Sequence, residues 1–221
     1  IRDRNTLNVE EDMPIESKML TRIIESSQKK VEGRNFSIRK NVLNYDDVLN
    51  KQREIIYTQR SQVLDGEDLH ASILNMMHEL AVESVNNYLL DDEDRDNWNL
   101  IGLKDHFLGW VLRDEDLDYS DDQLEEIKKA DVAKLLEDRM LEIYSAKEAE
   151  FGGELIRELE RVILLKVVDT KWMNHIDDMA ELKKGIGLRA FGQKNPVVEY
   201  RYEGFEMFDA MVEAIREDTV R

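Results

Sequence analysis

One glycine-rich segment, GIGLRAFGQKNP at residues 185–196, combines positive charge with bulky apolar side chains. No acid lies between Leu182 and Val198, and four cations fall in or beside the segment: Lys183, Lys184, Arg189 and Lys194. Phe191 and Leu188 are its large apolar residues. A basic loop that exposes an aromatic ring is typical of a surface that contacts other macromolecules. The competing interpretation is that Phe191 folds back onto its own helices.

The glycines of this segment do not form a nucleotide site. A phosphate-binding loop ends in Lys followed by Ser or Thr, follows a buried strand and begins a helix. GIGLRAFG has neither the lysine terminus nor a preceding strand. We therefore expect no nucleotide to bind within this chain.

Acidic and histidine residues suggest two further sites: His175 with Asp177 and Asp178, and the adjacent pair Asp46 and Asp47. Neighbouring residues on a helix point about 100° apart, whereas a divalent metal needs several converging ligands. We interpret these groups as charges on helix surfaces and expect no metal site. A metal-dependent helical enzyme remains the weaker alternative, and no catalytic residue is predicted.

The elements that carry these residues are expected to be helices. Two prolines and ten glycines in 221 residues leave few breaks, and 36% of the residues are charged, so we predict an all-α fold. The chain has no cysteine, which excludes disulfides and thiolate metal sites. It shows no signal peptide and no apolar run long enough to span a bilayer. The net charge of −18 disfavours nucleic acid as a partner.

Charge also divides the chain into segments. Residues 67–150 hold 24 acidic and 8 basic residues, and so carry −16 of the net −18. We predict a linker at 1–13, a long helix at 14–66, a small acidic helical domain at 67–150, and an antiparallel helical hairpin at 151–221. In the hairpin, Asn195 and Pro196 should begin the second helix after a loop that starts at Gly185.

The long helix has apolar residues on more than one side. One seam repeats every seven residues, but Gln28, Asn35 and Gln52 interrupt it. A helix that is apolar on several faces has several partners, so we predict a scaffold helix with the hairpin packed against it. The alternative is a structural coiled-coil protein that dimerises along residues 14–64.

Two stretches resemble the SecA family of preprotein translocase motors. They are QKKVEGRNFSIRKNVLNYDDVLNKQREIIY at residues 28–57, and DTKWMNHIDDM with LKKGIGLRAFGQKNPVVEY between residues 169 and 200. The resemblance implies a helical scaffold domain, a helical wing domain and a two-helix finger. The family's nucleotide-binding motor domains should then precede residue 1. Phe191 stands where many members have tyrosine, so it keeps the ring and lacks the hydroxyl.

The resemblance also implies contact residues. Those expected to meet the motor domains are Arg34, Asn35, Arg39, Tyr45, Asp46, Asp47 and Arg53. Those expected at the finger tip, against preprotein and channel, are Leu188, Arg189, Phe191, Gln193 and Lys194. The implied role is mechanical and non-catalytic: the long helix passes nucleotide-driven movement to the hairpin and restrains ATP turnover.

The implied partners are the motor domains of the same polypeptide, a SecYEG-type membrane channel and unfolded preprotein, with a homodimer of the parent as a further possibility. ATP and Mg would belong to the parent motor, and this chain would hold no cofactor. The implied location is the cytoplasm, peripherally at the inner face of the bacterial cell membrane.

Overall fold

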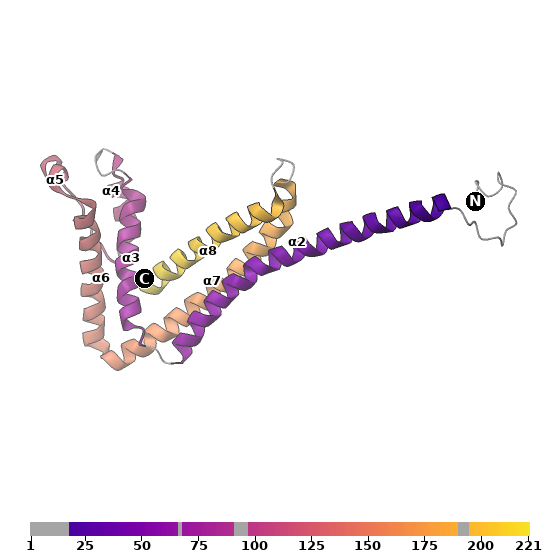
Figure 1. Ribbon diagram of the computed structural model, residues 1–221. Helices are drawn as coiled ribbons and strands as arrows, with labels where there is room; N and C mark the ends of the chain where they lie inside the picture. The colour runs from indigo at the N-terminus through magenta and orange to yellow at the C-terminus, as the bar shows by residue number, and fades with distance from the viewer. Residues whose placement is uncertain (1–17, 66–67, 91–96, 190–194) are drawn as a thin grey trace. The chain divides into compact units, whose positions relative to one another are not determined.

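The computed structural model describes residues 18–65, 68–90, 97–189 and 195–221. Within these ranges every regular element is a helix, and the only other pairings are isolated bridges between Leu89 and Trp98 and between Leu108 and Leu112 (Figure 1). The predicted all-α class is confirmed. The chain divides into two compact units, residues 1–47 and residues 48–221, which are described separately below.

Helix α2, Lys18–Leu64, is a single helix of 47 residues. It continues through Gly33, its only glycine. A Cβ at Gly33 would meet nothing within 4 Å, so no packing contact requires a glycine there. The interior glycine costs only about 1 kcal/mol relative to alanine, which a helix of this length tolerates. The structure thus has one helix from Lys18 to Leu64, within the predicted range 14–66.

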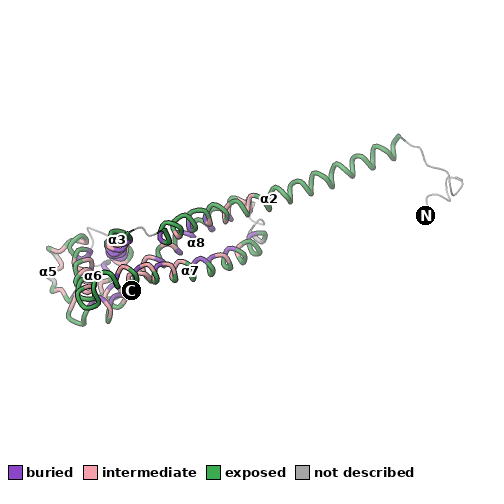
Figure 2. Tube along the Cα trace, turned by 90° about the horizontal axis from the view of Figure 1, so that it is seen from below, coloured by how far each residue is buried: buried purple, intermediate pink, exposed green. Residues whose placement is uncertain are grey.

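In the first unit, the residues of α2 are mostly exposed (Figure 2). Several of them are large apolar residues with 42–72% of their surface exposed: Met19, Leu20, Ile23, Ile24, Val31, Phe36, Ile38, Val42 and Leu43. A single helix cannot bury an apolar face on its own, so these side chains have no core within their unit.

In the second unit, helices α7, Gly153–Arg189, and α8, Pro196–Val220, lie side by side as a hairpin (Figure 1). Asn195 begins α8 as predicted, because its Oδ1 accepts a hydrogen bond from Val197 N at 3.0 Å and Pro196 occupies the first turn. The hairpin buries Trp172, Met179, Ile186, Tyr200, Phe208, Met211 and Ile215.

The first arm of the hairpin is longer than predicted. We expected α7 to end near Lys184 and a loop to begin at Gly185, but the helix includes Gly185 and Gly187 and ends at Arg189. Ile186, between the two glycines, is only 2% exposed. Burial of one isoleucine contributes about 1.5–3 kcal/mol, which offsets the roughly 1 kcal/mol that each glycine costs.

The acidic segment forms α3, His70–Tyr88, α4, Leu100–Phe107, α5, Asp121–Glu126, and α6, Lys129–Phe151, with α3 packed along α6 (Figure 1). Its helices bury Ile73, Met77, Leu80, Val85, Leu103, Phe107, Val132, Leu136 and Met140. Asp131 is the third residue of α6 and accepts a hydrogen bond from Lys128 N at 3.0 Å. Gly152, at φ +86°, separates α6 from α7.

Candidate functional site

The predicted tip of the hairpin is only partly within the described ranges. The backbone of Leu188 and Arg189 forms the last turn of α7 rather than a loop. Phe191, Gln193 and Lys194 lie outside the described residues. Lys184, one of the four predicted cations, has its Nζ 2.6 Å from Glu181 Oε1, so part of the positive charge is balanced by an acid just before the segment.

The predicted contact residues of the scaffold helix are not gathered into one pocket. Arg34, Asn35 and Arg39 are exposed, as are Asp46 and Asp47, while Tyr45 and Arg53 are half-buried. Arg53 donates to Asn50 Oδ1 at 3.0 Å. From residue 34 to residue 53 these side chains extend over roughly 30 Å of helix axis, so they form an extended surface rather than a site.

The best-defined polar arrangement of the second unit joins three helices through Gln52 of α2. Gln52 Nε2 donates to the carbonyl oxygen of Gly204 in α8 at 2.7 Å. Its Oε1 lies 3.0 Å from Nε2 of His175 in α7. An amide oxygen only accepts, so His175 Nε2 carries the proton and donates. We call Gln52, His175 and Gly204 the Gln52 junction.

His175 corrects the sequence interpretation, because it is a core residue and not a helix-surface charge. It is 3% exposed, and its ring lies 5.6 Å from that of Trp172 and 5.8 Å from that of Phe208. Burial lowers the pKa of His175 below its ordinary value, while the charge of Asp178 opposes this shift. The imidazole is therefore held as the neutral form that donates to Gln52.

Close helix packing surrounds the Gln52 junction. A Cβ built on Gly204 would lie 2.8 Å from Met179 Cε, 3.3 Å from Met179 Sδ and 3.6 Å from Val48 Cγ1. Met179 is itself only 1% exposed. The glycine thus lets α8 lie close to Met179 and Val48, and a larger residue would displace the end of the flexible Met179 side chain.

Charged side chains connect the hairpin to its neighbours on either side. Arg216 of α8 pairs with two acids of α3, with its Nη2 2.9 Å from Glu79 Oε2 and its Nη1 bonded to Glu83. Arg60 of α2 forms a two-pronged pair with Asp169 of α7, the shorter N–O distance being 2.9 Å. The first pair joins the hairpin to the acidic domain, and the second joins it to α2.

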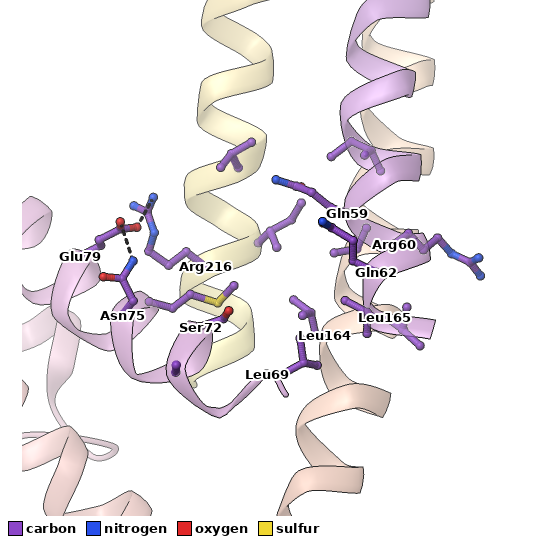
Figure 3. A pocket seen from close by; sticks show the side chains of 17 residues that line it. Gln59, Arg60, Gln62, Leu69, Ser72, Asn75, Glu79, Leu164, Leu165 and Arg216 are labelled. Atoms are coloured by element: carbon purple, nitrogen blue, oxygen red, sulfur yellow. Dashed lines mark hydrogen bonds and ion pairs between the residues drawn. The ribbon is translucent and has the colours of Figure 1, made fainter. Parts of the chain in front are cut away.

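A cavity of about 570 Å³ lies between the ends of α2 and α3 and the two hairpin helices. Its wall is mixed: Leu69, Leu164 and Leu165 are apolar, while Gln59 and Arg216 bring polar groups (Figure 3). Figure 3 shows Arg216 beside Glu79 at one wall of this cavity.

A second buried polar group lies where α6 meets α7. Tyr144 donates to Glu160, which is 7% exposed, and Arg157 donates to Tyr144, Glu160 and Glu148. Burial, together with the hydrogen bond to Glu160, raises the pKa of Tyr144 to about 12. His70 Nδ1 is 3.1 Å from the Tyr144 hydroxyl, so α3 joins the group as well.

Two acidic residues of the loop after α4 also form hydrogen bonds and ion pairs with other residues. Asp116 accepts from the backbone N of Arg113 at 2.8 Å and from Arg139 Nη2 at 3.1 Å. The backbone hydrogen bond and, after it, the guanidinium of Arg139 lower the pKa of Asp116. Lys104 Nζ lies 2.7 Å from Asp118 Oδ1. These acids stabilise the fold of the loop.

Across the described ranges, no three His, Asp or Glu side chains come together in a way that could hold a metal ion. None of the helices in these ranges is long and apolar enough to cross a membrane. The polar contacts among the described residues instead connect helices to one another.

The fold and these contacts between helices define a helical scaffold module, in which one long helix carries a hairpin and a small acidic domain. The comparisons with known proteins agree. The family model described as "SecA Wing and Scaffold domain" matches residues 14–221. The chain belongs to the SecA family, in its wing and scaffold part.

Relatives named protein translocase subunit SecA are similar over nearly the whole chain. Identity is 50% over 215 residues with that of Acetivibrio thermocellus, 54% over 220 residues with that of Clostridium botulinum, and 47% over 215 residues with that of Pelotomaculum thermopropionicum. Each match covers 97% of this chain, which spans only 24–26% of the relatives' own length.

Sequence reasoning missed the Gln52 junction, although a signal was present. Gln52 was recorded only as an interruption of the heptad seam. A polar residue on an otherwise apolar helical stripe indicates a buried polar partner, but it does not say which residue supplies that partner.

Proposed function

We propose that this chain is the non-catalytic scaffold and wing portion of an ATP-driven protein-export motor. Its long helix receives nucleotide-driven movement from motor domains elsewhere in the same polypeptide and passes it to the hairpin. Support comes from the family match and from relatives named as translocase subunits, of which this chain spans about a quarter.

The observation that carries the proposal is the division of α2 into two kinds of surface. In residues 18–47 large apolar side chains such as Phe36 are exposed, whereas in the rest of the helix Gln52, Ile56 and Val63 are buried against the second unit. One continuous helix thus has a packed segment and a segment whose apolar side chains have no cover in its own unit. A scaffold that binds further domains has this pattern.

The proposed partners follow from the same division. The exposed apolar segment of α2, with Arg34, Asn35, Arg39, Tyr45, Asp46, Asp47 and Arg53 on and beside it, would bind the motor domains and restrain their ATP turnover. The hairpin tip would contact a SecYEG-type channel and unfolded preprotein. ATP and Mg would bind the motor domains, and the chain would act at the cytoplasmic face of the bacterial cell membrane.

A reconstitution tests the scaffold role directly. This chain, added to separately expressed motor domains, should bind them and lower their basal ATP turnover. Ile38→Asp should abolish both effects because it places a charge on the exposed apolar face. Ser26→Asp adds the same charge elsewhere on the same helix and should leave binding intact. If the two variants bind equally well, this face is not the motor-binding surface.

A separate experiment tests the hairpin tip in the full-length protein. Phe191→Gly should lower preprotein translocation while leaving the melting temperature and basal ATP turnover unchanged, because a side chain that grips other molecules fills no core. A large fall in melting temperature would place Phe191 in the packed core instead. Normal translocation at normal stability would mean that the ring has no role in export.

A further inference from the structure

Gln52 is the polar member of the packed segment of α2. Its neighbours on the same stripe, Ile56 and Val63, are buried apolar residues, whereas Gln52 is 6% exposed with both ends of its amide engaged. Apolar side chains attract without direction, so Ile56 and Val63 pack about equally well in several alignments of neighbouring helices. The amide of Gln52 is different because its donor and acceptor have fixed positions.

The two bonds of Gln52 reach both arms of the hairpin. The donor reaches the Gly204 carbonyl of α8 and the acceptor receives the proton of His175 in α7. Sliding the hairpin along α2 by one helical turn, about 5.4 Å, breaks both bonds together. His175 would then keep a buried donor without an acceptor, which is costly in a site surrounded by Trp172 and Phe208.

We propose that the Gln52 junction sets the register between the scaffold helix and the hairpin, with Gln52 and His175 as its positioning residues. The approach of Gly204 to Val48 of α2 agrees with this: Val48 Cγ1 would lie 3.6 Å from a Cβ built on Gly204, so α8 lies close to α2 where Gln52 reaches a backbone carbonyl at 2.7 Å. Single buried polar residues fix helix alignment in this way in helical assemblies, at some cost in stability. The register itself stands on geometry. Its use in transmitting movement rests on the proposed function.

The test uses apolar replacements that keep the packing and remove the polar requirement. In the full-length protein, Gln52→Met alone should lower the melting temperature, because it leaves the His175 donor unpaired. Gln52→Met with His175→Phe should recover most of that loss, since replacing both partners with apolar groups of similar shape is nearly neutral. Gln59→Met, the same substitution seven residues later at an exposed position of α2, is the matched control.

Register is then measured by distance. Spin labels at Thr58 of α2 and Ala180 of α7, both exposed, report how far the hairpin has moved along the helix. The unaltered protein and Gln59→Met should give one narrow distance. The double variant should give a second distance, displaced by about 5 Å, as expected for a slip of one turn. A single unchanged distance in the double variant overturns the proposal. If the double variant does not fold, Gln52→Met alone supports or overturns the proposal by the same criterion.

Translocation measured on the same variants separates the two claims. A second register accompanied by reduced translocation at normal melting temperature supports both the register role and the transmission of movement. A second register with unaltered translocation supports the register role and refutes transmission through this junction. An unchanged register refutes the inference whatever the translocation rate.

Discussion

The same substitution at two glycines should have opposite effects on stability. Gly204→Ala and Gly185→Ala both place a methyl group on a hairpin helix, and each gains about 1 kcal/mol of helix propensity. At Gly185 the new Cβ meets nothing within 4 Å, so that gain should be realised in full. At Gly204 it lies 2.8 Å from Met179 Cε, in a core where Met179 is 1% exposed.

The expected change in stability follows from the space around Gly204. Overpacking a well-filled core costs about 1–3 kcal/mol, so Gly204→Ala should be neutral or destabilising by up to about 2 kcal/mol after its propensity gain. The two variants should therefore differ by roughly 1–3 kcal/mol in the free energy of unfolding. For a chain of this length that corresponds to about 2–4 °C in Tm for each kcal/mol. Thermal unfolding followed by circular dichroism measures it.

A double-mutant cycle identifies the cause. Met179→Ala should cost about 2–5 kcal/mol by itself, but less in the presence of Gly204→Ala, because the new methyl group enters the space that the methionine leaves. Additive effects would show that the two residues do not compete for space. Equal stabilisation by Gly185→Ala and Gly204→Ala would refute the close-approach argument outright.

Three further outcomes are expected. Burial depresses the pKa of His175, so its contribution to stability is complete above its ordinary pKa of 6.5 and is lost as pH falls below that value. The difference in unfolding free energy between the unaltered chain and His175→Phe should therefore shrink or reverse from pH 7 to 5, by at most about 1.4 kcal/mol per pH unit. A difference that stays constant with pH would contradict this prediction. Arg216→Met should destabilise by roughly 1 kcal/mol and speed hydrogen exchange in α3, with a smaller effect at high salt; equal exchange rates would show that the pairs with α3 contribute nothing. Tyr144→Phe should cost about 1–3 kcal/mol in urea unfolding, because it removes a hydroxyl bonded to the buried Glu160, whereas Tyr202→Phe on an exposed face should stay within about 0.5 kcal/mol.

Features of the helices that depend only on residues close together in the sequence could be predicted. Continuity of α2 followed from the absence of proline between Lys18 and Leu64, and the start of α8 followed from Asn195 and Pro196. Where burial outweighed local preference the prediction was wrong. The two glycines of the GIGL run indicated a loop, but Ile186 packs into the core and keeps α7 helical to Arg189.

The Gln52 junction could not be derived from spacing, because its members are far apart along the chain. The sequence neighbours of His175, Asp177 and Asp178, are exposed, because residues within one turn of a helix lie on different sides of it. Only the packing of α7 against α2 decides which side a residue takes. Helix periodicity gives the faces of each helix and leaves their pairing open.

The sequence separation within the junction has a consequence for biosynthesis. The two bonding partners of Gln52 come 123 and 152 residues later in the chain. At a synthesis rate of about 5–20 residues per second, Gln52 waits roughly 8–30 s before both of its partners have been made. The acidic domain, whose helices contact one another at shorter separations, can fold in that interval. The buried side chains of α2, Gln52, Ile56 and Val63, therefore stay uncovered during synthesis until the hairpin is made.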